Sequence, residues 1–217
     1  MTLNCSQKKR DGYMKMPDQS KVDLIRIIKN FIDEEDAQTV IDYINLNINR
    51  FSLDERSLGG NRYSYRIGND NVHKDSRKNL DELIDLKDIV DKYTKKILAV
   101  TQKEYGDYRD LYLSSIWLAK QESGADITYH KDVDDGYNPQ FVYSAVLYLN
   151  TIESEGSLRF PVLRYEYSPQ AYDLIIFPAD GIEFYHGVDR VGEDRYSVPM
   201  WMTHDKSFEL RFSNAKI

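Results

Sequence analysis

The chain has 217 residues and is 41% hydrophobic, 12% aromatic and 30% charged, with a formal net charge of -7. A chain of this length can bury roughly 70% of its unfolded surface, and its aromatic content excludes a disordered acidic chain, so we expect one soluble globular domain. The acidic balance disfavours a broad nucleic-acid surface, which needs a basic face.

Residues 1–20 form a polar tail, and residues 21–217 are predicted to form the single domain. No apolar run approaches the ~18 residues that a membrane span needs, and the tail lacks the apolar core of a signal peptide. We therefore expect a cytoplasmic protein without membrane contact. Cys5 is the only cysteine, so an internal disulfide and a thiolate metal cluster are excluded, and any metal must use His, Asp or Glu.

The first half of the domain, to about residue 110, is predicted to supply helical support. Residues 22–31 form a short apolar run that favours a strand. A helix should follow, since apolar residues recur at i, i+3 and i+4 spacing and three acids precede them; these apolar residues are Ala37, Val40, Ile41, Ile44 and Ile48. A second helix is predicted over residues 80–103, ending before Gly106.

Residues 52–79 are a long polar segment between the two helices. Its alternating pattern around Gly59 and Gly60 favours a hairpin. Two interpretations stay open: a solvent-exposed connector, or a substrate-covering lid whose arginines and tyrosines contact an extended peptide. The residues meant are Arg56, Arg62, Tyr63, Tyr65 and Arg66.

From about residue 111 to 205, eight short β-type runs follow one another with turn residues between them and no helical pattern. This spacing favours an antiparallel sandwich or barrel of jelly-roll type. The expected fold class is therefore α+β, a double-stranded β-helix (jelly-roll) barrel with N-terminal helices packed on one face.

Two of the four histidines begin the same tripeptide, His73-Lys74-Asp75 and His130-Lys131-Asp132. Residues i and i+2 of a strand project from one face, so His-x-Asp can hold a metal through an imidazole and a carboxylate. His130 ends a β-type run, whereas His73 lies in a polar stretch, so we interpret His130 as the ligand and His73 as a surface residue. His186, in a late strand, is the expected third ligand, although a satisfied core histidine is the alternative.

Arg195 opens the last β-type run, nine residues after His186. It shares a strand face with Ser197 and Trp201, opposite a face of apolar residues. This arrangement suggests a buried anion site, although an arginine paired with a surface acid is the commoner situation.

The pattern of His130, Asp132, His186 and Arg195 resembles the iron(II)- and 2-oxoglutarate-dependent dioxygenases of prolyl-hydroxylase type. Supporting residues match as well, at Gly124, Tyr148-Leu149-Asn150, Gly156, Leu158-Arg159-Phe160-Pro161 and Trp201. The resemblance covers about residues 111–203 and, more loosely, the opening strand and helix. Gln121 departs from it, because many relatives carry there a tyrosine that helps to hold the co-substrate.

The resemblance implies that His130, Asp132 and His186 bind Fe(II) as two histidines and one carboxylate, leaving open positions for 2-oxoglutarate and dioxygen. Arg195 would bind the distal carboxylate of 2-oxoglutarate, with Tyr148 as a second donor. Ascorbate is an optional further reductant. Because the carboxylate of Asp132 is present, hydroxylation is expected rather than halogenation.

The substrate has no motif in the sequence, and three interpretations stay open. The first is hydroxylation of a polypeptide, prolyl or similar. The second is hydroxylation of a free amino acid or other small molecule; nucleobase demethylation is disfavoured by the acidic charge. The third is a non-catalytic jelly-roll protein that only binds a ligand.

Overall fold

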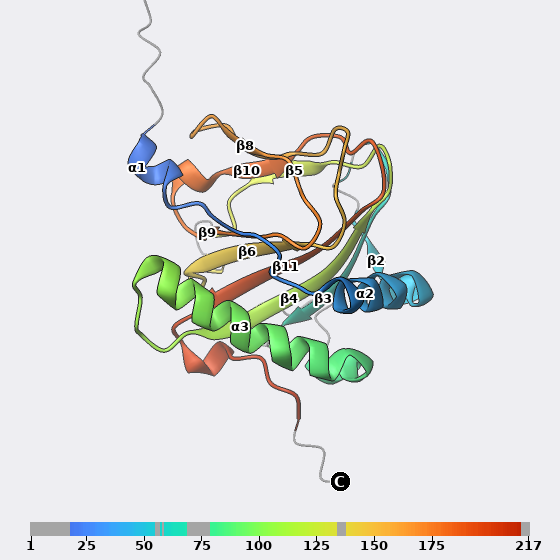
Figure 1. Cartoon of the computed structure of the whole chain (residues 1–217), viewed down its shortest axis with the longest axis horizontal. Helices are drawn as coiled ribbons and strands as arrows, with labels where there is room; N and C mark the ends of the chain where they lie inside the picture. The colour runs from blue at the N-terminus through green and yellow to red at the C-terminus, as the bar shows by residue number, and fades with distance from the viewer. Residues whose placement is uncertain (1–17, 55–56, 58, 69–78, 134–137, 214–217) are drawn as a thin grey trace, which may run out of the picture.

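The computed structural model describes residues 18–54, 57, 59–68, 79–133 and 138–213 (Figure 1). Its helical half contains α1 (Gln19–Val22), β1 (Arg26–Ile28), α2 (Glu34–Leu46), η1 (Ile48–Arg50), β2 (Ser52–Leu53), β3 (Arg62–Gly68), η2 (Leu80–Leu86) and α3 (Lys87–Tyr105). Its second half contains β4 (Tyr112–Gln121), β5 (Ile127–His130), β6 (Tyr143–Tyr148), β7 (Leu158–Phe160), β8 (Tyr165–Tyr167), β9 (Leu174–Pro178), η3 (Ile182–Phe184), β10 (His186–Val188), β11 (Arg195–Thr203) and η4 (Lys206–Phe208).

Two antiparallel sheets form the body of the domain. The larger sheet has the order β1-β9-β6-β11-β4-β3-β2, and the smaller one has the order β5-β10-β7-β8. In Figure 1, helices α2 and α3 lie on one side of the larger sheet and the smaller sheet lies on the other side. This arrangement fits the predicted jelly-roll type, with helices on one face.

All eight predicted β-type runs of the second half contain strands, β4 to β11. Alternation along β11 is also as predicted: Ser197 pairs with Ala119 and Tyr148, and Val198 projects to the opposite face, into the core beside the helices. The long edge-to-edge pairing of β11 with β4 and β6 places it in the centre of the larger sheet. Its residues therefore face either the helices or the space between the two sheets.

The structure corrects three boundaries in the helical half. Only residues Arg26–Ile28 of the apolar run 22–31 form a strand, because α1 takes up its start. Helix α2 ends at Leu46, so Ile48 lies in the following 3-10 turn. Residues Leu80–Leu86 are 3-10 helix with a kink at Leu83, and the α-helix begins only at Lys87. Local periodicity does not distinguish these tight turns from α-helix, because both bury residues three apart.

The main core lies between the helices and the larger sheet. Helix α3 contributes Val90, Tyr93 and Ile97 to it, at the spacing of one helix face, and Gly106 ends the helix in the left-handed conformation at φ 60°. The backbone N–H of Gly106 donates to the carbonyl of Gln102, which is a normal helix end. This face fixes the larger sheet against α3.

Replacing Ile97 by Ala should lower the free energy of unfolding by about 2–5 kcal/mol, because Ile97 is fully buried and the cavity cannot refill. Lys95→Ala, on the exposed side of the same helix, is the matched control and should change it by no more than about 0.5 kcal/mol. Urea unfolding of both variants measures the difference. Equal free energies of unfolding for the two variants would contradict the burial of Ile97 against the larger sheet.

Candidate functional site

Three side chains that could hold a metal ion meet at the edge of the smaller sheet. They are His130 at the end of β5, Asp132 just after it, and His186 at the start of β10, and one ligand atom from each lies within 4.8 Å of the others. Strands β5 and β10 are antiparallel, and His130 is the direct partner of His186. The pairing therefore brings together residues that are 56 positions apart in the chain.

Both imidazoles are oriented by backbone carbonyls. Nδ1 of His130 lies 2.8 Å from the carbonyl oxygen of Thr128, and Nδ1 of His186 lies 2.8 Å from that of Phe184. A carbonyl oxygen only accepts, so each Nδ1 carries the proton and, in the neutral ring, each Nε2 presents a lone pair. Such contacts orient histidine ligands in metal sites.

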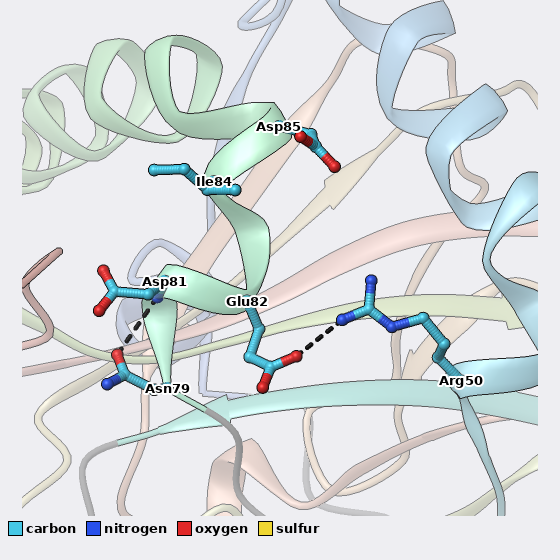
Figure 2. A pocket seen from close by; sticks show the side chains of 6 residues that line it. All are labelled: Arg50, Asn79, Asp81, Glu82, Ile84 and Asp85. Atoms are coloured by element: carbon cyan, nitrogen blue, oxygen red, sulfur yellow. Dashed lines mark hydrogen bonds and ion pairs between the residues drawn. The ribbon is translucent and has the colours of Figure 1, made fainter.

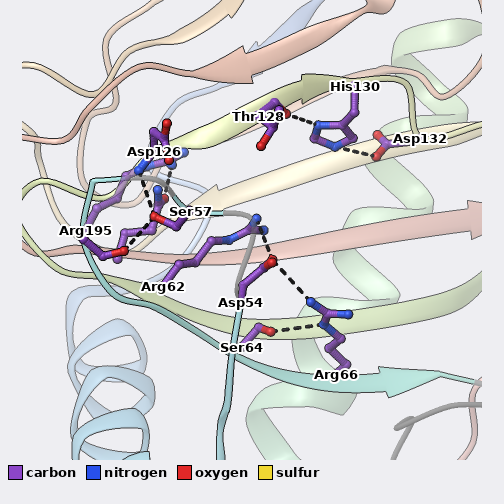
Figure 3. A network of polar contacts seen from close by, with 12 residues as sticks. Asp54, Ser57, Arg62, Ser64, Arg66, Asp126, Thr128, His130, Asp132 and Arg195 are labelled. Atoms are coloured by element: carbon purple, nitrogen blue, oxygen red, sulfur yellow. Dashed lines mark hydrogen bonds and ion pairs between the residues drawn. The ribbon is translucent and has the colours of Figure 1, made fainter.

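The two Nε2 atoms face the same carboxylate. Nε2 of His130 lies 3.5 Å from one oxygen of Asp132, and Nε2 of His186 lies 3.8 Å from the other. Figure 3 shows the His130–Asp132 side of this group. Two imidazole nitrogens and one carboxylate oxygen this close together can bind one divalent cation of the iron or manganese type.

The electrostatics of the group suit metal binding. Burial by itself would raise the pKa of Asp132, but the adjacent imidazoles outweigh it and hold that pKa below its usual range, so the carboxylate is charged. Burial lowers the pKa of His186 below its usual value. His130 is the more accessible of the two: 39% of its side chain is exposed, against 8% for His186.

Arg195 lies on the inner face of the larger sheet and is almost completely buried, with 1% exposed. Its guanidinium donates one hydrogen bond to Oε1 of Gln121 and lies 5.0 Å from the ring centre of Tyr148. In the part of the chain that the structure describes, no acidic side chain pairs with it, and its Nε donor has no partner. A buried, uncompensated charge is costly, and an anion bound at this position would reduce that cost.

Two neighbours of Arg195 also carry buried polar atoms without a hydrogen bond of normal geometry. These atoms are the phenolic oxygen of Tyr148 and Nε2 of Gln121. Burial raises the pKa of Tyr148 above its ordinary value, so the phenol keeps its proton and can donate. The three atoms together form a set of donors for a single acceptor, such as a carboxylate.

Arg62 provides a contrast with Arg195 on the same sheet face. Both residues are direct partners of Gln121, one from β3 and the other from β11. Arg62 has its own carboxylate, because Asp54 lies 3.0 Å from its guanidinium and 3.3 Å from that of Arg66 (Figure 3). Among the described residues, the sheet thus neutralises Arg62 internally, whereas Arg195 has no acidic partner.

A pocket separate from the His130-Asp132-His186 group lies near η2, on the helix side of the larger sheet (Figure 2). Arg50, Asn79, Asp81, Glu82, Ile84 and Asp85 line it. Glu82 accepts hydrogen bonds from Arg50 at 2.7 Å and from Tyr65 at 2.9 Å, so Arg50 and Glu82 offset each other's charge. We interpret these contacts as structural.

The hypothesis that residues 52–79 form a lid is wrong for the strand part of that segment. The predicted hairpin is present, but β3 is an inner strand of the larger sheet, between β2 and β4. Tyr65 is 1% exposed and faces the helices, where it cannot contact a peptide. Arg56 lies outside the described residues. Strand β3 enters the sheet by pairing with β4, whose partner residues lie 47 to 59 positions later in the chain. Pairing over this distance leaves no local signal in the sequence.

Two glycines allow the chain before β3 to pack closely against the chain after β4. A Cβ atom at Gly59 would lie 2.2 Å from the carbonyl oxygen of Gly124, which follows β4 and has a φ of 93°. Two backbones can approach this closely only where both residues lack side chains. Gly124 thus has a packing role near the site.

The other predicted positions are partly outside the described residues. His73 lies outside them, so its assignment as a surface residue stays a prediction. His204 contacts Asp107 at 3.1 Å and the carbonyl of Asp110 at 2.8 Å, remote in sequence from the triad. The residues that sequence reasoning missed are Asp54 as partner of Arg62 and the donor role open to Gln121.

No helix among the described residues is long and apolar enough to cross a membrane. No family model matches the sequence. No curated protein matches it either.

Solved structures are similar in fold. The viral collagen prolyl hydroxylase of Paramecium Bursaria Chlorella virus-1, in complex with 2-oxoglutarate, is 15% identical, with a TM-score of 0.60 over 82% of this chain and 95% of the viral one. A prolyl hydroxylase of Trichoplax adhaerens, in complex with a peptide fragment of the hypoxia inducible factor, is 15% identical, with a TM-score of 0.62 over 88% of each chain. A 2OG-Fe(II) oxygenase from Burkholderia pseudomallei is 14% identical, with a TM-score of 0.62 over 87% and 89%.

These likenesses concern the fold, because the identities are low. The meeting of two histidines and one aspartate at the edge of the smaller sheet is an observation on this chain itself. The chain therefore has the fold of the prolyl hydroxylases and 2OG-Fe(II) oxygenases, and within that fold it carries a His130-Asp132-His186 group that could hold a metal ion.

Proposed function

We propose that the protein is an Fe(II)- and 2-oxoglutarate-dependent dioxygenase that hydroxylates an unactivated C–H bond. The observation that carries the proposal is the convergence of two carbonyl-oriented imidazoles on one buried, charged carboxylate. Two histidines and one carboxylate are the ligand set of non-haem Fe(II) oxygenases, and they leave positions open for other ligands. We also propose that β4 to β11 form the double-stranded β-helix expected from the sequence.

His130, Asp132 and His186 would hold the metal, and Arg195 with Tyr148 would hold the distal carboxylate of 2-oxoglutarate. The bound iron and co-substrate supply the oxidising chemistry, in which dioxygen is consumed, 2-oxoglutarate becomes succinate and CO2, and the substrate gains a hydroxyl group. The chain itself contributes orientation. Its backbone carbonyls fix the imidazoles, and the sheet holds a guanidinium fork that can make two parallel hydrogen bonds to a carboxylate.

The donor set at Arg195 supports 2-oxoglutarate as the co-substrate. Arg195, Tyr148 and Gln121 offer buried donors, and no acidic side chain among the described residues pairs with Arg195. Tyr148 and Ser144 lie on the same face of β6. Ser144 is also close enough to Asp132 for its hydroxyl to lower the pKa of that carboxyl group. The anion position and the metal group thus lie on the same side of the larger sheet, where we propose that one dianionic 2-oxo acid reaches both.

For the substrate we propose a polypeptide, with a prolyl-type residue as the site of hydroxylation. Support comes from the similar structures, two of which are prolyl hydroxylases, one of them solved with a peptide fragment. His130 supports it as well, because its partly exposed ring opens the metal group to a large substrate. An unactivated C–H bond of such a residue needs the oxidising power that a 2-oxoglutarate enzyme provides.

The test is incubation of the protein with Fe(II), 2-oxoglutarate, ascorbate and a mixed library of peptides and metabolites, followed by mass spectrometry. We expect a peptide product heavier by one oxygen atom, together with succinate. Asp132→Ala is the control and should form neither. A product found only among free amino acids would replace the peptide substrate by a small molecule, and binding of 2-oxoglutarate without any product would leave a non-catalytic binding protein.

A further inference from the structure

We infer that Gln121 binds the same anion as Arg195, through its side-chain amide nitrogen, and selects a co-substrate with a distal carboxylate. The inference rests on the proposed function, in which that anion is the distal carboxylate of 2-oxoglutarate. It assigns a binding role to a residue at which this chain departs from the family pattern.

The position of Gln121 follows from the sheet. It is the last residue of β4 and is 1% exposed. Its direct partners on the neighbouring strands are Arg62 on β3 and Arg195 on β11, so its side chain lies on the inner face between two arginines. An uncharged side chain at this point is therefore surrounded by donors.

The orientation of the amide follows from its one hydrogen bond. Oε1 accepts from Nη1 of Arg195, and a guanidinium has no acceptor, so the amide cannot be turned round without placing two donors against each other. Nε2 must then point elsewhere, and among the described residues it has no hydrogen-bond partner. A buried amide nitrogen without an acceptor destabilises the folded protein, and a ligand that accepts its hydrogen bond would remove this cost.

Three buried atoms around this point have no hydrogen bond of normal geometry among the described residues, and all three can donate. They are Nε2 of Gln121, Nε of Arg195 and the phenolic oxygen of Tyr148. A carboxylate has only acceptors and can take up to about four hydrogen bonds. A neutral or donor-bearing group in the same place would leave some of these donors unpaired, so the set discriminates in favour of a carboxylate.

A glutamine at position 121 also leaves the positive charge of Arg195 available to a ligand. Its carbonyl oxygen orients the guanidinium without cancelling its charge, whereas a glutamate of the same shape would form an ion pair with it. The contrast with Arg62, whose charge Asp54 offsets, shows that this sheet can build such internal pairs. In Gln121→Glu, the new carboxylate should therefore compete with an anionic ligand for Arg195.

The experiment uses the full chain loaded with Mn(II), and calorimetry with two probes. The first probe is 2-oxoglutarate. The second is 2-oxopentanoate, which has the same number of carbons and lacks the distal carboxylate. The variants are Gln121→Met and Gln121→Glu, with Gln102→Glu on α3 as the matched control for the added charge. Thermal unfolding without ligand reports whether each variant is folded.

We expect Gln121→Met to weaken 2-oxoglutarate binding about tenfold to a hundredfold, since it removes a hydrogen bond to a charged group. Its affinity for 2-oxopentanoate should stay at the wild-type value. Gln121→Glu should weaken 2-oxoglutarate binding by more than about a hundredfold, yet unfold without ligand at the same temperature as the wild type or higher, because the new carboxylate compensates Arg195. Gln102→Glu should bind 2-oxoglutarate with the wild-type affinity.

Two results would overturn the inference, and they differ in what they say about the proposed function. If the wild type binds 2-oxoglutarate and Gln121→Met binds it equally well, Gln121 is only structural and the proposed function stands. If the wild type with Mn(II) does not bind 2-oxoglutarate at all, the proposed function fails, and the role of Gln121 fails with it.

Discussion

Arg195→Ala should weaken the binding of 2-oxoglutarate at least about a hundredfold and leave the affinity for Mn(II) unchanged. The guanidinium is buried and has no acidic partner among the described residues, so the ligand would supply its only counter-charge. Removing one partner of a buried, hydrogen-bonded ion pair costs about 3–5 kcal/mol, which corresponds to more than a hundredfold in affinity. Calorimetry with the metal-loaded protein measures both affinities.

Two further variants sharpen this experiment. Arg195→Lys should recover only part of the affinity, because a lysine ammonium lacks the two parallel donors of the fork. Arg159→Ala is the matched control, since Arg159 lies on β7 of the smaller sheet, half exposed and paired with Glu166 and Asp189. Unchanged 2-oxoglutarate affinity in Arg195→Ala would remove the anion site from the proposed function.

Asp132→Ala and His186→Ala should each weaken Mn(II) or Fe(II) binding by more than about a hundredfold. Each variant removes one of three converging ligand atoms. Loss of a residue that merely orients a ligand already costs ten- to a hundredfold in metal affinity, so loss of a ligand must cost more. Calorimetry under anaerobic conditions, with the metal as titrant, gives the affinities directly.

His204→Ala is the control for these ligand variants, because His204 contacts Asp107 and the carbonyl of Asp110. Its metal affinity should equal that of the wild type. The wild type should also unfold at a higher temperature with Mn(II) than with a chelator, and His186→Ala should lose this difference. Wild-type metal affinity in His186→Ala would show that His186 is a buried core histidine, the alternative left open by the sequence.

Some of the site was predictable because its determinants are local. His130 is the last residue of β5 and Asp132 follows two residues later, and this short spacing keeps an imidazole and a carboxylate within reach of one metal ion. The face that Arg195 shares with Ser197 follows from the alternation of side chains along a strand, and so does the existence of the eight strands. Each inference needs only the neighbours within one element.

The rest depended on contacts between distant segments. Only the antiparallel register makes His186 the partner of His130, and only the order β3-β4-β11 puts Gln121 between two arginines. The pairing of β3 with β4 also makes part of the candidate lid segment an inner strand of the larger sheet. The sequence by itself determined which residues point the same way along each strand, because that is covalent geometry; tertiary structure decided which strands meet, because pairing is set by packing over the whole domain.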